Sequence, residues 1–106
     1  MPKYLVAVSY TAEGARGVAQ EGGSGRLAAA RALVESVGGT LESFHFAFGD
    51  ADVLAIADIP TASDAAALAL AVGSSGAASV RTTVLLTVEE MDAASRRAAS
   101  YRAPGA

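Results

Sequence analysis

Residues 40–60 read TLESFHFAFGDADVLAIADIP, and this stretch decides the fold. Two apolar runs flank the short polar segment GDAD at residues 49–52. Apolar runs that are separated by a Gly/Asp cluster are typical of a β-hairpin. We therefore expect two strands, over Thr40–Phe48 and Val53–Ile59, that are joined by this turn.

The segments on either side of the hairpin predict further strands and helices. Residues 3–10 (KYLVAVSY) and 79–87 (SVRTTVLLT) are rich in residue types that favour strands. Apolar residues three or four apart predict a helix over Arg26–Val37, which would end at the glycine pair 38–39. Two more helices are expected, over Ala65–Val72 and from Val88 to about Tyr101.

Polar residues at the helix starts predict N-caps. Thr87 and Glu90 have the spacing of a capping box, in which each side chain bonds the other residue's backbone N–H. The other expected caps are Thr11 for a turn or short helix, Ser24 for the helix over Arg26–Val37, and Ser63 or Asp64 for the next helix.

Residues 22–25 (GGSG) interrupt the helical pattern, because three glycines in four positions resist a regular helix. We expect a mobile loop at this point. The alternative is an anion-binding site at the start of the helix that follows. The segment lacks the lysine and the spacing of a P-loop, so the mobile loop is the favoured interpretation.

The expected elements follow the order β-α-β-β-α-β, with an extra C-terminal helix. This order predicts a ferredoxin-like α+β fold, in which two helices cover one face of a four-stranded antiparallel sheet. With 106 residues the chain has the length of a single domain. We expect this domain over residues 1–100 and a loose tail over residues 101–106.

Composition limits the class of function. The net charge of −3 and the lack of a basic stripe argue against nucleic-acid binding through phosphate contacts. The chain has no cysteine, which excludes disulfides and thiolate metal sites. The N-terminus lacks the apolar run of a signal peptide, and the apolar segments are far shorter than the ~20 residues of a membrane span. We expect a cytoplasmic protein with no membrane or nucleic-acid partner, no metal and no cofactor.

The sheet of such a fold has a second face that its two helices leave uncovered. Both faces of the hairpin are apolar, with Phe44, Phe46 and Phe48 on one side of the first strand and Leu41 and Ala47 on the other. Apolar residues therefore remain on the uncovered face in either orientation, and such a patch usually marks an interaction surface. We predict a dimer or larger homo-oligomer that packs sheet on sheet. The alternative is that the C-terminal helix folds back over this face.

The N-terminal segment MPKYLVAVSYTAEGARG, the hairpin ESFHFAFGDADVLAIADIP and the later segment SVRTTVLLTVEEM resemble the GYD domain family of small bacterial and archaeal proteins. The similarity extends over roughly residues 2–92. The family is named for a Gly-Tyr-Asp signature at the hairpin turn, where this chain has Gly49 and Asp52 but Ala51 in place of the usual tyrosine. Any role of that tyrosine hydroxyl is therefore missing here. The resemblance implies a dimeric α+β barrel and no particular activity, because none is established for the family.

His45 is the one histidine of the chain, and it lies mid-strand between Phe44 and Phe46. An imidazole titrates near neutral pH, so His45 could serve as a general base or ligand group inside a barrel cavity. The alternative, which is the commoner use of a lone histidine, is a partly exposed or hydrogen-bonded strand residue.

Carboxylates gather at the hairpin. Asp50 and Asp52 lie in the turn, and Glu42 and Asp58 lie toward the strand ends. Such groups could form a carboxylate pair or hold a hard cation. The favoured alternative is turn chemistry, because an Asp side chain bonds nearby backbone N–H groups. A metal site also lacks a second histidine and a recognisable ligand spacing.

Tyr4 and Tyr10 share one face of the first strand, where their hydroxyls could orient a ligand. The alternative is ordinary packing in which only the hydroxyl reaches a polar partner.

Three function hypotheses follow. The first is a non-enzymatic oligomeric module that binds a small apolar or aromatic ligand, or a protein partner, on the apolar face of the sheet. Its candidate ligand-binding residues are Tyr4, Tyr10, His45, Asp50 and Asp52. The second is a cofactorless dimeric-barrel enzyme, of the oxygenase or isomerase type, that uses His45 in a cavity between sheets. The third is a regulatory oligomer that takes up an anion at residues 22–25.

Overall fold

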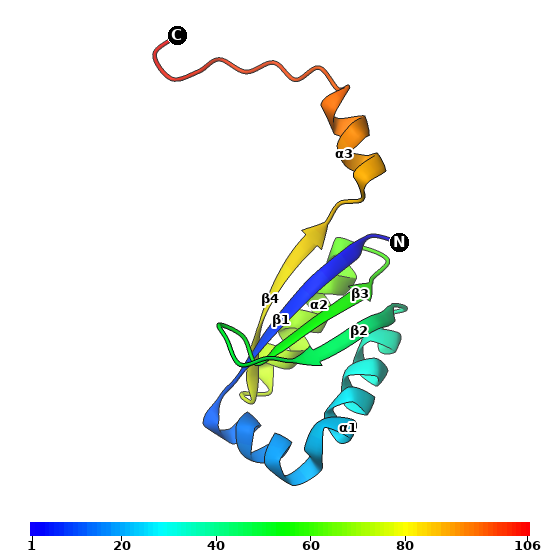
Figure 1. Ribbon diagram of the computed structural model, residues 1–106, viewed down its shortest axis with the longest axis vertical. Helices are drawn as coiled ribbons and strands as arrows, with labels where there is room; N and C mark the ends of the chain where they lie inside the picture. Colours follow the sequence, from blue (N-terminus) through cyan, green and yellow to red (C-terminus); the bar gives the residue numbers. More distant parts are fainter.

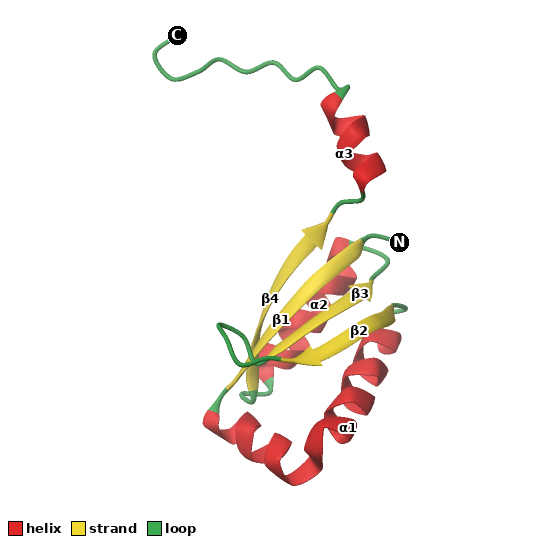
Figure 2. Ribbon diagram, viewed as in Figure 1, coloured by secondary structure: helices red, strands yellow, loops and turns green.

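A computed structural model describes the whole chain, residues 1–106, and confirms the expected order of elements (Figure 1, Figure 2). The chain has the ferredoxin-like α+β fold, with an extra helix at the C-terminal end. The strands are β1 Lys3–Tyr10, β2 Thr40–Phe46, β3 Val53–Asp58 and β4 Ala78–Leu85, and the helices are α1 Ala12–Ser36, α2 Ala62–Ser74 and α3 Val88–Ser95.

The four strands form one sheet in the order β2-β3-β1-β4, and all neighbouring strands are antiparallel. The centre of the sheet is therefore β1 and β3, and β2 and β4 are its edges. Figure 1 shows α1 alongside β2 and α2 behind the sheet. Residues of both helices face the same side of the central strands, so one face of the sheet is covered and the other is not.

Side chains of the central strands alternate between these two faces. Tyr4 and Val6 of β1 and Val53 of β3 point toward the helices and are buried. The main cluster of buried core residues is Tyr4, Val6, Val34, Val53, Ala55, Ala57, Ile59, Ala65 and Leu68. The alternate residues lie on the other surface, which we call the open face. It includes Lys3, Leu5, Ala7, Ser43, His45, Leu54, Ile56, Asp58, Arg81, Thr83 and Leu85.

A β-bulge in β2 decides which side chains reach the open face. The register shifts between Leu41 and Ser43, so that Leu41 pairs with Ala57 and Phe44 pairs with Ala55. Both side chains therefore pack against the core, although strict alternation would put them on opposite faces. The expectation that Leu41 and Phe44 lie on opposite sides of this strand is wrong, and the bulge removes one large apolar side chain from the open face.

The glycine segment at residues 22–25 is helical, which corrects the loop expected there. Only Gly22 leaves the helical conformation, with φ 77°, and it kinks α1 between two helical halves. A Cβ on Gly23 would lie 3.1 Å from the Phe46 ring, so glycine lets α1 approach β2 closely. This packing outweighs the poor helix propensity of glycine. The helix therefore starts well before Ser24, and the N-cap expected at Ser24 is wrong.

The helix α2 also begins earlier than expected. Its N-cap is Thr61, whose hydroxyl accepts a hydrogen bond from the backbone N–H of Asp64 at 3.1 Å. The caps predicted at Ser63 or Asp64 are wrong, because the capping oxygen precedes the helix and Asp64 lies inside its first turn.

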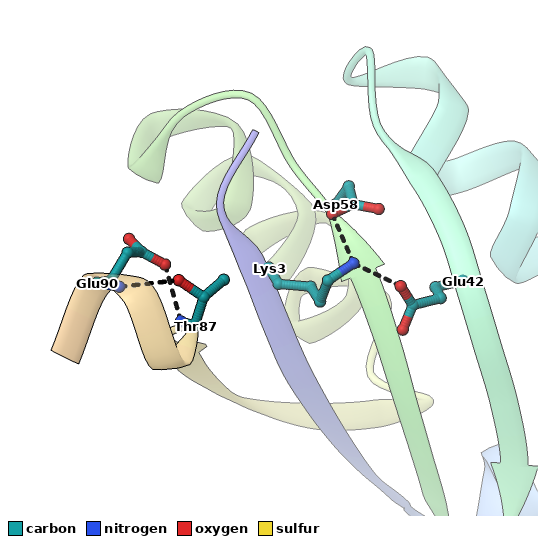
Figure 3. Close-up of polar contacts among 5 residues, drawn as sticks. All are labelled: Lys3, Glu42, Asp58, Thr87 and Glu90. Atoms are coloured by element: carbon teal, nitrogen blue, oxygen red, sulfur yellow. Dashed lines mark hydrogen bonds and ion pairs between the residues drawn. The ribbon is translucent and has the colours of Figure 1, made fainter. Parts of the chain in front are cut away.

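The other two predicted caps are confirmed. The Thr11 hydroxyl accepts a hydrogen bond from the N–H of Gly14 at 3.2 Å. Thr87 and Glu90 form the capping box at the start of α3, with bonds of 2.9 and 3.0 Å (Figure 3). The elements that end short of their predicted last residues are α1 at Ser36, β2 at Phe46, β3 at Asp58, β4 at Leu85 and α3 at Ser95.

The helix α3 projects away from the sheet, and the chain beyond it runs further outward (Figure 1). None of its residues is buried, and Val88 and Met91 are 73% and 54% exposed. The Cα radius of gyration is 16.8 Å, against about 13 Å for a compact domain of this length. α3 therefore does not fold back over the open face. None of the helices combines the length and the apolar character that crossing a bilayer requires.

Candidate functional site

The open face carries an apolar stripe along its centre. Strand pairing arranges its residues in two adjacent rows across the sheet, His45-Leu54-Ala7-Arg81 and Ser43-Ile56-Leu5-Thr83. The central strands supply the apolar members of both rows, and the edge strands supply the polar ones. We call Leu5, Ala7, Leu54 and Ile56 the apolar stripe. An apolar centre with a polar rim is the usual anatomy of a protein interface.

An ion-pair cluster closes one end of this face (Figure 3). Lys3 starts β1, and its ammonium bonds the carboxylates of Glu42 on β2 and Asp58 on β3, the latter at 3.1 Å. The hydrogen bond to Glu42, and next the one to Asp58, raise the pKa of Lys3 above its ordinary value. Lys3 lies between the two carboxylates and offsets their charge.

Sequence reasoning did not single out Lys3. The opposite charges of Lys3 and Asp58 could have identified it, because antiparallel pairing of β1 with β3 brings these two residues opposite each other. That pairing follows from the ferredoxin-like strand order and does not follow from the sequence of either strand alone.

His45 lies on the open face at the β2 edge, opposite Leu54. Its side chain is exposed, and no hydrogen bond to the imidazole is present in the chain. A general base needs a partner that orients it and a proton donor within reach. Within a single chain His45 has neither, so its catalytic or ligand-binding role stays a prediction.

Tyr4 and Tyr10 lie on the other face of the sheet, toward the helices. Tyr4 is part of the core and only 7% exposed, and Tyr10 is half-buried near Arg26 of α1. The structure therefore separates both tyrosines from His45 by the thickness of the sheet. The five candidate ligand-binding residues do not form one site within the chain.

Asp50 and Asp52 lie in the hairpin turn and have different surroundings. Asp50 is exposed, whereas the Asp52 carboxylate accepts a hydrogen bond from the backbone N–H of Tyr10 at 2.8 Å. The Asp52 N–H donates to the Val8 carbonyl, also at 2.8 Å. Ala51, between these two aspartates, is buried and only 7% exposed. Asp52 thus joins the turn to β1. No group of three or more His, Cys, Asp or Glu side chains that could hold a metal ion occurs in the structure.

The sequence matches the family model of the GYD domain over residues 4–95, which is most of the chain. No curated protein and no solved structure shows significant similarity to it. Except for Lys3 at the start of β1, the match includes all residues of the four strands and three helices described above. The chain therefore belongs to the GYD domain family.

Proposed function

We propose that this GYD-domain protein is a small homo-oligomeric binding module whose subunits associate through the open face. One observation carries the proposal: the apolar stripe lies at the centre of the sheet with no helix over it. Leu54 remains 40% exposed although its strand is one of the two central ones. Water contact with such a stripe is unfavourable by roughly 25 cal/mol for each Å² of apolar surface.

A second copy of the chain is the simplest cover for this surface. A two-fold axis would bring the same stripe from both subunits together, so the contact is self-complementary. Sheets pack face to face in this way about 10 Å apart, with side chains interdigitating between them. The charged rim, Lys3 with Asp58 at one end and Arg81 at the β4 edge, would remain at the border in contact with water.

The same arrangement supports a binding role. Ala7 is the smallest member of the stripe, and it lies between Leu54 and Arg81 in its row. Where Ala7 of one subunit faces Ala7 of the other, the two packed sheets would leave room for a small apolar or aromatic molecule. His45 lies at the β2 end of that row, where its imidazole could bond a polar group of the ligand.

The enzyme hypothesis has less support. A cofactorless reaction at His45 needs a second polar group in the cavity, and none lies within hydrogen-bond reach of His45 in the chain. The binding module needs only the surface that is present.

Native mass spectrometry of the purified protein tests the proposal. We expect a dimer or larger species, and additional mass on it would identify the class of ligand between the sheets. An oligomer without additional mass would favour a closed interface and a role in protein association. A monomer at micromolar concentration would contradict the proposal.

A further inference from the structure

A cavity of about 100 Å³ lies on the helix-covered side of the sheet, between the central strands and helices α1 and α2. Hydrocarbon side chains form almost all of its wall. α1 packs mainly on β2 and α2 mainly on β4, and the cavity occupies the region between them. We call this cavity the inner chamber.

Small side chains create the inner chamber. Ala29 and Ala30 of α1 face Ala55, Ala57 and Ala78 of the sheet across it. Each contributes a single methyl group where a larger side chain would fill the space. An apolar void is unfavourable because the atoms around it lack contacts, and such voids stay dry and take up small apolar molecules. The chamber therefore suits a single aromatic ring or a short hydrocarbon chain.

A larger and more polar hollow, of about 350 Å³, adjoins the chamber between the first half of α1 and the end of α2. Tyr10, Arg26 and Val72 belong to the walls of both spaces, so the two meet at these residues. Glu13 and Glu21 contribute negative charge to the outer hollow. A ligand that enters the chamber would pass Arg26.

Arg26 is the one charged side chain in the chamber wall. Its Nη1 donates to Oε2 of Glu21 at 3.2 Å, and the two side chains remain 35% and 40% exposed. This exposed ion pair is weak and occupies one of the five N–H groups of the guanidinium, so other N–H groups can bind a second acceptor. Burial lowers the pKa of Arg26, but the nearby Glu21 carboxylate and Tyr10 hydroxyl raise it more, so the pKa lies above its ordinary value.

We propose that the inner chamber and Arg26 form a binding site for a small carboxylic acid. The ring or short chain of the ligand fills the chamber, and its carboxylate bonds the guanidinium, whose planar fork matches a carboxylate. Glu21 competes with the ligand for Arg26. The site lies across the sheet from the open face and does not depend on association of subunits.

Benzoate and toluene are the probes, because they share a ring and differ in the carboxylate. We expect benzoate to shift amide resonances around the chamber in an NMR titration of the full-length protein. R26M should weaken benzoate binding by about tenfold or more and leave toluene binding nearly unchanged. E21Q should tighten benzoate binding. R31M, which replaces an exposed arginine of the same helix, should change the binding of neither benzoate nor toluene.

Filling the chamber provides the second test. A30L places a larger side chain in the space and should abolish binding of both probes, whereas A32L at an exposed position of α1 should not. If A30L unfolds the protein, A30V serves as the milder variant. Failure of millimolar benzoate to perturb the chamber residues would overturn the proposal. Benzoate binding that is unchanged in R26M or in A30L would also overturn the proposal.

Discussion

The Asp52 carboxylate accepts a hydrogen bond from the backbone N–H of Tyr10 at 2.8 Å, and so joins the hairpin turn to the end of β1. The backbone of Asp52 makes a second contact with the same strand, from its N–H to the Val8 carbonyl at 2.8 Å. Asp52 therefore holds the turn against a strand that is distant in sequence. The conformation of the turn depends on this residue more than on its neighbour Asp50.

Replacing Asp52 with alanine should lower the free energy of unfolding by about 1–3 kcal/mol, because the Tyr10 N–H loses its acceptor. D50A is the matched control, and we expect a change within about 0.5 kcal/mol because Asp50 is exposed. Urea denaturation followed by circular dichroism measures both. Equal effects of the two substitutions would show that Asp52 has no special role in the turn.

Two glycines of α1 should respond oppositely to alanine. A Cβ on Gly14 would clash with the backbone carbonyl oxygen of Ala77, so G14A must push α1 away from the loop before β4. We expect a loss of more than about 2 kcal/mol of stability. A Cβ on Gly17 meets nothing within 4 Å, and G17A should stabilise by up to about 1 kcal/mol. Thermal unfolding measures the stability of both variants. A G14A variant as stable as wild type would mean that α1 does not pack against the Ala77 carbonyl as described.

The Lys3 cluster predicts a stability change at high pH. Hydrogen bonds to Glu42 and Asp58 raise the pKa of Lys3 in the folded chain. The stabilisation is therefore fully present below the unfolded pKa of about 10.4 and is lost as the pH rises through the raised folded value. Wild type should lose stability relative to K3M only above about pH 10. A difference between the two proteins that stays constant from neutral to strongly alkaline pH would refute this linkage.

Deletion of residues 88–106 tests whether α3 packs on its own sheet. No residue of α3 is buried, so its removal should change the free energy of unfolding by less than about 0.5 kcal/mol. The comparison is made in an L54E background, where association through the open face should be absent. A loss of more than about 1 kcal/mol would indicate that α3 returns to the sheet in solution.

The sequence predicted the parts of the fold that depend on local pattern. The strand over Lys3–Tyr10 is correct at both ends, and the capping box of Thr87 and Glu90 is present as expected. Both depend on short-range preferences, in side-chain type for the strand and in a fixed spacing for the cap. The element order then followed, and with it the ferredoxin-like fold.

The errors arose where contacts between distant segments decide the structure. Gly23 is helical because α1 packs closely on Phe46, which local propensity cannot reveal. The bulge beside Glu42 moves Leu41 to the covered face, and no Gly or Pro marks it in the sequence. Likewise, the partners of Lys3 come from β2 and β3, so this part of the site required the strand order.

The association of subunits through the open face is tested most directly by L54E, with L70E as the matched control. Leu54 lies in the apolar stripe, whereas Leu70 is 72% exposed on α2, away from the open face. Size-exclusion chromatography with light scattering gives the mass of each variant, and circular dichroism confirms that it is folded. We predict that wild type and L70E are dimers or larger species and that L54E is a monomer, because a buried unpaired carboxylate costs several kcal/mol. A folded L54E with the mass of the wild-type oligomer, or a monomeric wild type, would contradict the account.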